Sequence, residues 1–181
     1  MGWWAAAACA MNRIFSFPPV ESAHAQTLVL GSMPGVMSLR LQQYYGHPHN
    51  AFWKIMGENL GFDSAAGYAQ RTSALVQRKV ALWDVLAACV REGSLDSRIE
   101  SGSTVPNDFA AFFATHASIR GVFFNGAKAE NLYRKHVLPH LALRHKLEYV
   151  RLPSTSPAHA GMPFAAKAQA WRVLLAGPLT R

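Results

Sequence analysis

The stretch TLVLGSMPG, residues 27–35, decides the fold. A short, mostly apolar run with β-propensity leads here directly into Gly-Ser-Met-Pro-Gly. Three more runs of this kind follow along the chain: VALWDVL (80–86), GVFFNG (121–126) and LEYVRLP (147–153). They are nearly continuous in hydrophobicity and do not alternate, which is typical of strands buried on both faces of a parallel sheet.

Helical patterns lie between and after the four runs, at residues 50–60, 64–78, 106–116, 127–137 and 163–176. Asn50 is placed as an N-cap for the first, and Pro163 and Gly177 flank the last. The alternation predicts an α/β fold, a three-layer α/β/α arrangement around a central four-stranded, mainly parallel sheet.

The unusual segments of the chain all follow predicted strands: residues 31–35, 84–97, 125–128 and 153–159. Ligands of open α/β sheets bind at the carboxyl ends of the strands. We therefore expect these four segments to converge on one site.

Composition limits the class of protein. Half of the 181 residues are hydrophobic and 15% are charged, which is typical of a globular chain. We expect one domain over residues 13–181, preceded by a flexible leader at 1–12. The longest uncharged apolar run is too short for a bilayer, so no membrane is expected. The two cysteines, Cys9 and Cys89, form no CxxC motif, which argues against a disulfide framework, a structural zinc site or a four-cysteine cluster and fits a reducing cytoplasm.

Charge is unevenly distributed. The net charge is +8, and residues 121–181 hold nine Lys and Arg against two Asp and Glu, whereas residues 1–120 hold nine against eight. This asymmetry fits either an ordinary solvated basic face or a surface for a polyanion such as nucleic acid.

The motifs taken singly leave alternatives open. The turn at 31–35 is not a GxGxxG, a P-loop or a GxSxG motif; it is either an ordinary turn or a loop whose Ser32 hydroxyl and amides donate hydrogen bonds. The two histidines in HPHNAFW (47–53) would need a distant third ligand, so no metal is expected. LPSTSPAHA (152–160) is either a phosphate-contacting loop or a plain connection, and CVREGSLDSRI (89–99), with Ser94 and Asp96, is either functional or a capped loop.

Together these segments resemble a known family. LGSMPG, QQYYGHPHNAFW, WDVLAACVREGSLDS, FFNGAKA and LPSTSPAHA, in this order over about residues 27–175, resemble the uracil-DNA glycosylase superfamily, and its hypoxanthine-DNA glycosylase branch in particular. The resemblance implies a metal-free α/β/α enzyme that hydrolyses the N-glycosidic bond of a deaminated base in DNA. It implies a monomer without cofactor whose partner is DNA containing a damaged base, with hypoxanthine as the expected base and uracil as the alternative.

The resemblance also implies roles for single residues. Asn50 would orient the attacking water, and Phe52 would stack on the extruded base, in a base-binding set that also holds Met33, Pro34, Gly35, Tyr45 and Asn125. The DNA strand would be held by Ser32, Ser154, Ser156 and His159.

Two positions depart from the family pattern. Met33 stands where superfamily members often carry a water-orienting Asn or Asp, and Leu152 stands where many carry His. These departures leave two other classes of function open. One is a non-catalytic nucleic-acid-binding module on the same fold, and the other is a small-molecule hydrolase such as a nucleosidase or a Ser/His esterase.

Overall fold

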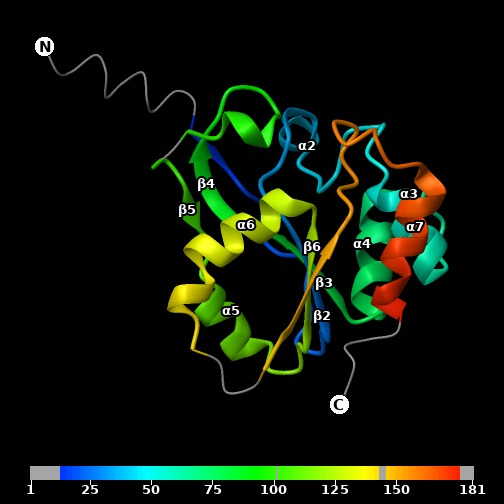
Figure 1. The fold of residues 1–181 in the computed structure, drawn as a ribbon. Helices are drawn as coiled ribbons and strands as arrows, with labels where there is room; N and C mark the ends of the chain where they lie inside the picture. The colour runs from blue at the N-terminus through cyan, green and yellow to red at the C-terminus, as the bar shows by residue number, and fades with distance from the viewer. Residues whose placement is uncertain (1–12, 101, 143–145, 176–181) are drawn as a thin grey trace, which may run out of the picture.

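The computed structural model describes residues 13–100, 102–142 and 146–175. Its centre is a parallel sheet in the order β3-β2-β6-β7, formed by β2 (Thr27–Gly31), β3 (Val80–Asp84), β6 (Gly121–Asn125) and β7 (Glu148–Leu152) (Figure 1). Every residue of β2 and β3 is buried, as the continuous apolar runs predict. The predicted fold class is confirmed.

Helices cover both faces of this sheet. α3 (Phe52–Leu60), α4 (Tyr68–Gln77) and α7 (Phe164–Trp171) lie on one side, and α5 (Phe109–Thr115) and α6 (Ala127–His136) lie on the other (Figure 1). All five were predicted, with ends that differ by a few residues. α7 tightens into the 3₁₀ helix η3 (Arg172–Leu175), and two further 3₁₀ turns are η1 (Asp96–Arg98) and η2 (Leu138–His140).

One predicted strand is wrong in its extent. The run 80–86 was expected to be a single strand, but β3 ends at Asp84 and a new strand, β4 (Leu86–Val90), begins after Val85. β4 leaves the central sheet and pairs in antiparallel fashion with β1 (Arg13–Phe15) and β5 (Val105–Pro106). The chain therefore crosses from one sheet to another within one apolar stretch.

The register of the central sheet places chemistry-bearing residues at one edge. Gly31 pairs with Asp84 across β2 and β3, and Asn125 pairs with Leu152 across β6 and β7. The short helix α2 (Val36–Leu41), which the sequence analysis did not predict, follows the turn after β2. The carboxyl ends of all four strands thus open towards the same set of loops.

No helix in the described part of the chain is long and apolar enough to cross a membrane. The predicted leader at 1–12 lies outside the described residues.

Candidate active site

A cavity of about 150 Å³ lies at the carboxyl ends of the strands, where the four segments were expected to meet. The structure brings nine predicted site residues to its wall: Ser32, Met33, Pro34, Gly35, Tyr45, Asn50, Asn125, Ser154 and Ser156. It also brings residues that the sequence analysis had not assigned, among them His47, Asp84, Ser94, Asp96 and Thr155. Phe52 and His159 are not part of the wall.

Asn50 reaches the cavity from the start of α3. The helix N-cap is Ala51, one residue later than predicted, but the Asn50 side chain still caps the helix, because its Oδ1 accepts a hydrogen bond of 3.0 Å from the Phe52 amide. An amide oxygen has two lone pairs, so this bond fixes the side chain and leaves one lone pair free. Asn50 is therefore both oriented by the helix and available to a ligand.

Tyr45 lines the cavity together with Tyr44, whereas Phe52 does not. Phe52 is fully buried, and its ring stacks under the Tyr45 ring with centroids 4.0 Å apart. The prediction that Phe52 contacts the base is thus corrected: Phe52 supports Tyr45 from below. Tyr45 has a φ of 53°, an uncommon left-handed conformation for a bulky residue, and such outliers cluster at functional sites.

Asn125 is tied to the last loop through Thr155. Its Nδ2 donates to Thr155 Oγ1 and its Oδ1 accepts from the Thr155 amide, both at 2.8 Å. The Thr155 carbonyl in turn accepts a bond from the Ala51 amide at 3.0 Å. Thr155 therefore joins the ends of β6 and β7 to the start of α3, next to Asn50.

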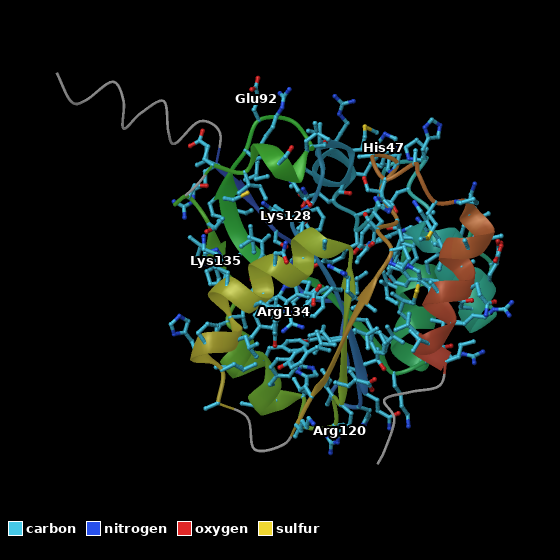
Figure 2. All side chains as sticks on the ribbon, in the orientation of Figure 1. His47, Glu92, Arg120, Lys128, Arg134 and Lys135 are labelled. Atoms are coloured by element: carbon cyan, nitrogen blue, oxygen red, sulfur yellow. The ribbon has the colours of Figure 1, made fainter. Side chains whose placement is uncertain are left out.

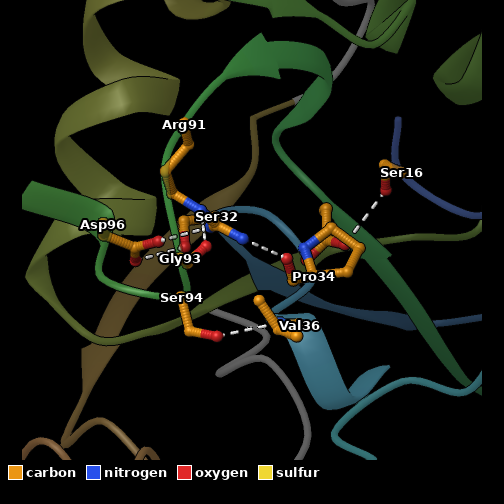
Figure 3. Close-up of polar contacts among 9 residues, drawn as sticks. Ser16, Ser32, Pro34, Val36, Arg91, Gly93, Ser94 and Asp96 are labelled. Atoms are coloured by element: carbon orange, nitrogen blue, oxygen red, sulfur yellow. Dashed lines mark hydrogen bonds and ion pairs between the residues drawn. The ribbon is translucent and has the colours of Figure 1, made fainter. Parts of the chain in front are cut away.

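The turn after β2 is clamped by the loop after β4 (Figure 3). Ser32 Oγ donates to Asp96 Oδ2 at 2.5 Å, and the buried Arg91 donates to the Pro34 carbonyl at 2.5 Å while pairing with Asp96 Oδ1 at 3.4 Å. Ser94 Oγ accepts from the Val36 amide at 2.8 Å. The Ser32 hydroxyl proton is thereby engaged within the protein, so the predicted donation from Ser32 to DNA is not available in this arrangement.

Two carboxyl groups stand at the cavity although the sequence holds none between Glu21 and Glu58. Burial raises the pKa of Asp84 to about 7 and also raises that of Asp96. Asp96 has donors on both oxygens, Ser32 and Arg91, which favour its charged form. Among the described residues, the donor to the Asp84 side chain is the neutral Ser16 hydroxyl at 3.0 Å. The two carboxyls thus occupy electrostatically different places.

Three tryptophans secure the backbone around the site. Trp53 donates its indole N–H to the Tyr44 carbonyl at 2.9 Å, Trp83 to the Phe17 carbonyl at 3.2 Å, and Trp171 to the Pro153 carbonyl at 2.9 Å. Trp53 and Trp171 therefore anchor segments that border the cavity, and Trp83 anchors the segment next to Ser16, the hydrogen-bond partner of Asp84.

The loop at 153–163 carries the remaining predicted residues. Ser154 and Ser156 accept backbone N–H bonds through their Oγ atoms, from Ser156 and Ala158 respectively, so both hydroxyl protons stay free to donate. The His159 ring is exposed, and its carbonyl accepts a bond of 2.7 Å from Lys167 Nζ. A DNA contact by His159 stays a prediction.

Basic side chains flank the site on α6. Lys128 lies in the first turn, at the end that faces the cavity, whereas Lys135 lies two turns further along the helix (Figure 2). Within the described residues no group of three or more His, Cys, Asp or Glu could hold a metal ion.

Comparisons with known proteins point to the superfamily that the sequence motifs resemble. The sequence model of the uracil DNA glycosylase superfamily matches residues 18–175. Two curated proteins named hypoxanthine DNA glycosylase, from Methanosarcina barkeri and Methanosarcina acetivorans, are each 40% identical over 114 residues, which is 62% of this chain and 71% of theirs. A solution NMR structure from Methanosarcina acetivorans, assigned as a uracil DNA glycosylase, is 32% identical, with a TM-score of 0.70 over 90% of this chain and 99% of that one.

The chain belongs to the uracil DNA glycosylase superfamily. It is a DNA glycosylase, a repair hydrolase that acts on N-glycosyl bonds in DNA.

Proposed function

We propose that this DNA glycosylase removes hypoxanthine from DNA, leaving an abasic site, and that Asn50 orients the attacking water. The proposal is carried by the Asn50 amide, which borders the same cavity as the turn at 31–35 and is held by a hydrogen bond from the Phe52 N–H. The two relatives named hypoxanthine DNA glycosylase support the choice of base.

The cavity suits a single base. Its volume of about 150 Å³ lies well below the roughly 300–1,000 Å³ of sites for drug-sized ligands. A nucleobase inside a duplex is out of reach, so the target nucleotide must be extruded before its base can enter. In the cavity the base would lie against the Tyr45 ring, with the backbone N–H groups of Met33 and Gly35 near its edge.

The chemistry then needs only an oriented water and a stabilised leaving group. The water oxygen bonds to C1′ as the C1′–N bond breaks, the bond electrons leave with the base, and the proton lost by the water balances the charge of the departing base. The free lone pair of Asn50 Oδ1 accepts one O–H of that water and holds its oxygen towards C1′. The Met33 side chain has no group that could do this, and we assign the part to the amide of Asn50.

The DNA strand would be held by the loop that follows β7. The free hydroxyl protons of Ser154 and Ser156 suit phosphate oxygens, and the Lys128 side chain adds positive charge beside the cavity. We further propose that the enzyme acts as a monomer and without metal.

The test is incubation with oligonucleotides that carry hypoxanthine, uracil or xanthine, followed by alkaline cleavage at abasic sites. We expect cleavage at hypoxanthine, unchanged when a chelator is added. Loss of cleavage on chelation, in a protein that stays folded, would contradict the metal-free mechanism. Release of hypoxanthine from free deoxyinosine at a comparable rate would instead assign a nucleosidase.

A further inference from the structure

One buried carboxyl at the cavity has no part in the mechanism above. Asp84 ends β3 beside Gly31 of β2, is 3% exposed and lines the cavity. Burying a carboxyl without a charged partner is costly, so its retention at a ligand-sized cavity points to a task there.

The two oxygens of Asp84 have different surroundings. Oδ2 accepts a hydrogen bond from Ser16 Oγ at 3.0 Å, while within the described residues no donor or acceptor is recorded for Oδ1. Oδ1 packs against Gly31, where an added Cβ would lie only 2.3 Å away. The same added Cβ would lie 3.0 Å from Tyr45 Oη, a buried hydroxyl to which the described residues offer no hydrogen bond of good geometry. Two buried oxygens, Asp84 Oδ1 and Tyr45 Oη, therefore both lie against Gly31 at this point of the wall.

The charged and titratable groups around Asp84 favour its neutral form. The pKa of Asp84 is raised to about 7: burial is the largest cause and Asp96 adds to the rise, while the Ser16 hydrogen bond and Arg91 oppose it. The other titratable groups that interact with it are three tyrosines, which are neutral at this pH: Tyr44, Tyr45 and Tyr68. Arg91 itself is paired with Asp96 and donates to the Pro34 carbonyl, so its guanidinium is directed at partners other than Asp84.

We propose that Asp84 enters the reaction as a neutral carboxylic acid whose Oδ1–H donates a hydrogen bond to the carbonyl oxygen that deamination creates on the base. This inference rests on the proposed function. Because Ser16 donates to Oδ2, Oδ2 acts as the carbonyl oxygen and the proton resides on Oδ1, the oxygen without a partner.

The protonation state would then set which bases are accepted. Deamination replaces an amino donor with a carbonyl acceptor, as in the change from adenine to hypoxanthine. A neutral acid can donate to that carbonyl, whereas an ionised carboxylate only accepts and repels it. Asp84 would therefore favour the damaged base only while it carries its proton.

The experiment compares Asp84→Asn, Asp84→Ala and a control, Asp63→Asn, which removes a carboxylate from an exposed loop position away from the cavity. Single-turnover release of hypoxanthine is measured for each variant from about pH 5.5 to pH 9. In the Asn variant the Ser16 hydroxyl holds the amide oxygen, so the NH₂ takes the place of Oδ1 and donates at every pH.

For the wild type and Asp63→Asn we expect the rate to fall about tenfold per pH unit above pH 7, as for loss of one essential proton. Asp84→Asn should lack this decline, and Asp84→Ala should be slower by about a hundredfold or more at neutral pH. Thermal unfolding of each variant confirms folding, and the Asn variant alone carries the test if the Ala variant does not fold.

The proposal is overturned if Asp84→Asn keeps the alkaline decline of the wild type, or if Asp84→Ala releases hypoxanthine at the wild-type rate. A wild type that leaves hypoxanthine in place but releases uracil or xanthine would refute the proposed substrate instead. Both of those bases also carry carbonyl groups, so the same variants would then decide the role of Asp84 on them.

Discussion

A single side-chain oxygen of Asn50 caps α3 and, in the proposed mechanism, also holds the water. Asn50 Oδ1 accepts a hydrogen bond from the Phe52 N–H at the start of α3 and keeps a second lone pair, which we propose for the water. A side chain fixed in this way would lose little entropy in the reaction. Under the proposed mechanism, the capping bond would therefore serve catalysis as well as the helix.

We predict that Asn50→Ala slows single-turnover base release by at least an order of magnitude, corresponding to roughly 2 kcal/mol or more of transition-state stabilisation. DNA binding should stay nearly intact, and loss of the cap should lower the free energy of unfolding by only about 1 kcal/mol. Rates, affinities and melting temperatures measured on the same preparations check this. Asn50→Asp is the control for capping, because Asp caps as well as Asn.

Near-wild-type release by Asn50→Ala would assign Asn50 to the helix start alone. The backbone of the turn at 31–35 would then be the better candidate for holding the water.

The stacked pair of Tyr45 and Phe52 should separate base contact from core packing. Tyr45→Ala should weaken capture of the base by roughly 1–3 kcal/mol with a modest change in melting temperature. Phe52→Ala should lower the free energy of unfolding by about 3–5 kcal/mol, because the side chain is fully buried. Tyr45→Phe, which keeps the ring, should retain the stacking contribution.

Measuring affinity for lesion DNA beside thermal unfolding decides between the two roles. A Phe52→Ala variant with full stability and lost capture would restore the role that the sequence had suggested for Phe52.

Among the elements, those with a strong hydrophobic pattern could be predicted and the short ones could not. The four parallel strands and five helices each span enough residues to show their period. By contrast, β1 has three residues and β5 has two, and β1 pairs with β4 across a long stretch of chain, Arg13 with Val90. No local pattern encodes such a pairing, so the second sheet and the break at Val85 were missed.

The position of the candidate site could also be predicted from the sequence, but the roles of some of its residues could not. Polar segments after strands were expected to converge, and most of them do. Asp84 was missed because it sits inside VALWDVL and reads as one polar residue of an apolar strand; only the register with Gly31 reveals that it faces the site. Tyr45 and Phe52 both belong to one aromatic segment, and sequence alone does not say which of the two side chains faces the cavity.

At the junction of elements, Thr155→Val tests whether the last loop positions the site. The change keeps the shape of the side chain but leaves Asn125 Nδ2 without its partner, which should cost about 1–3 kcal/mol of stability. We expect a drop in single-turnover rate as well, because the same loop contacts Ala51 beside Asn50. Thr115→Val is a matched control, since its hydroxyl bonds only within and just after α5.

A Thr155→Val enzyme that is less stable but fully active would show that the junction supports the fold without shaping the site.

For the molecule as a whole, the excess of positive charge predicts salt-dependent DNA binding. A plot of log affinity against log salt concentration should have a clear negative slope. Lys128→Glu should weaken binding with little dependence on sequence, and Lys135→Glu should weaken it less. The two residues lie seven apart on α6, so Lys135 is roughly 10 Å further from the cavity end (Figure 2).

A slope near zero would remove the argument from charge. Equal losses for the two lysine variants would place the DNA along the whole of α6 and not at its first turn. Arg151 is less suited to this test because it already pairs with Glu130 at 3.5 Å.

The anchored indoles have a further consequence. Trp53 and Trp171 each donate a hydrogen bond to the backbone of a segment that borders the cavity, and Trp83 donates one to Phe17, next to the Ser16 that bonds Asp84, so rearrangement of these segments changes the surroundings of a fluorophore. The enzyme thus carries native optical reporters of the segments around its site. Stopped-flow emission could follow strand capture, nucleotide extrusion and product departure as separate phases in unlabelled protein.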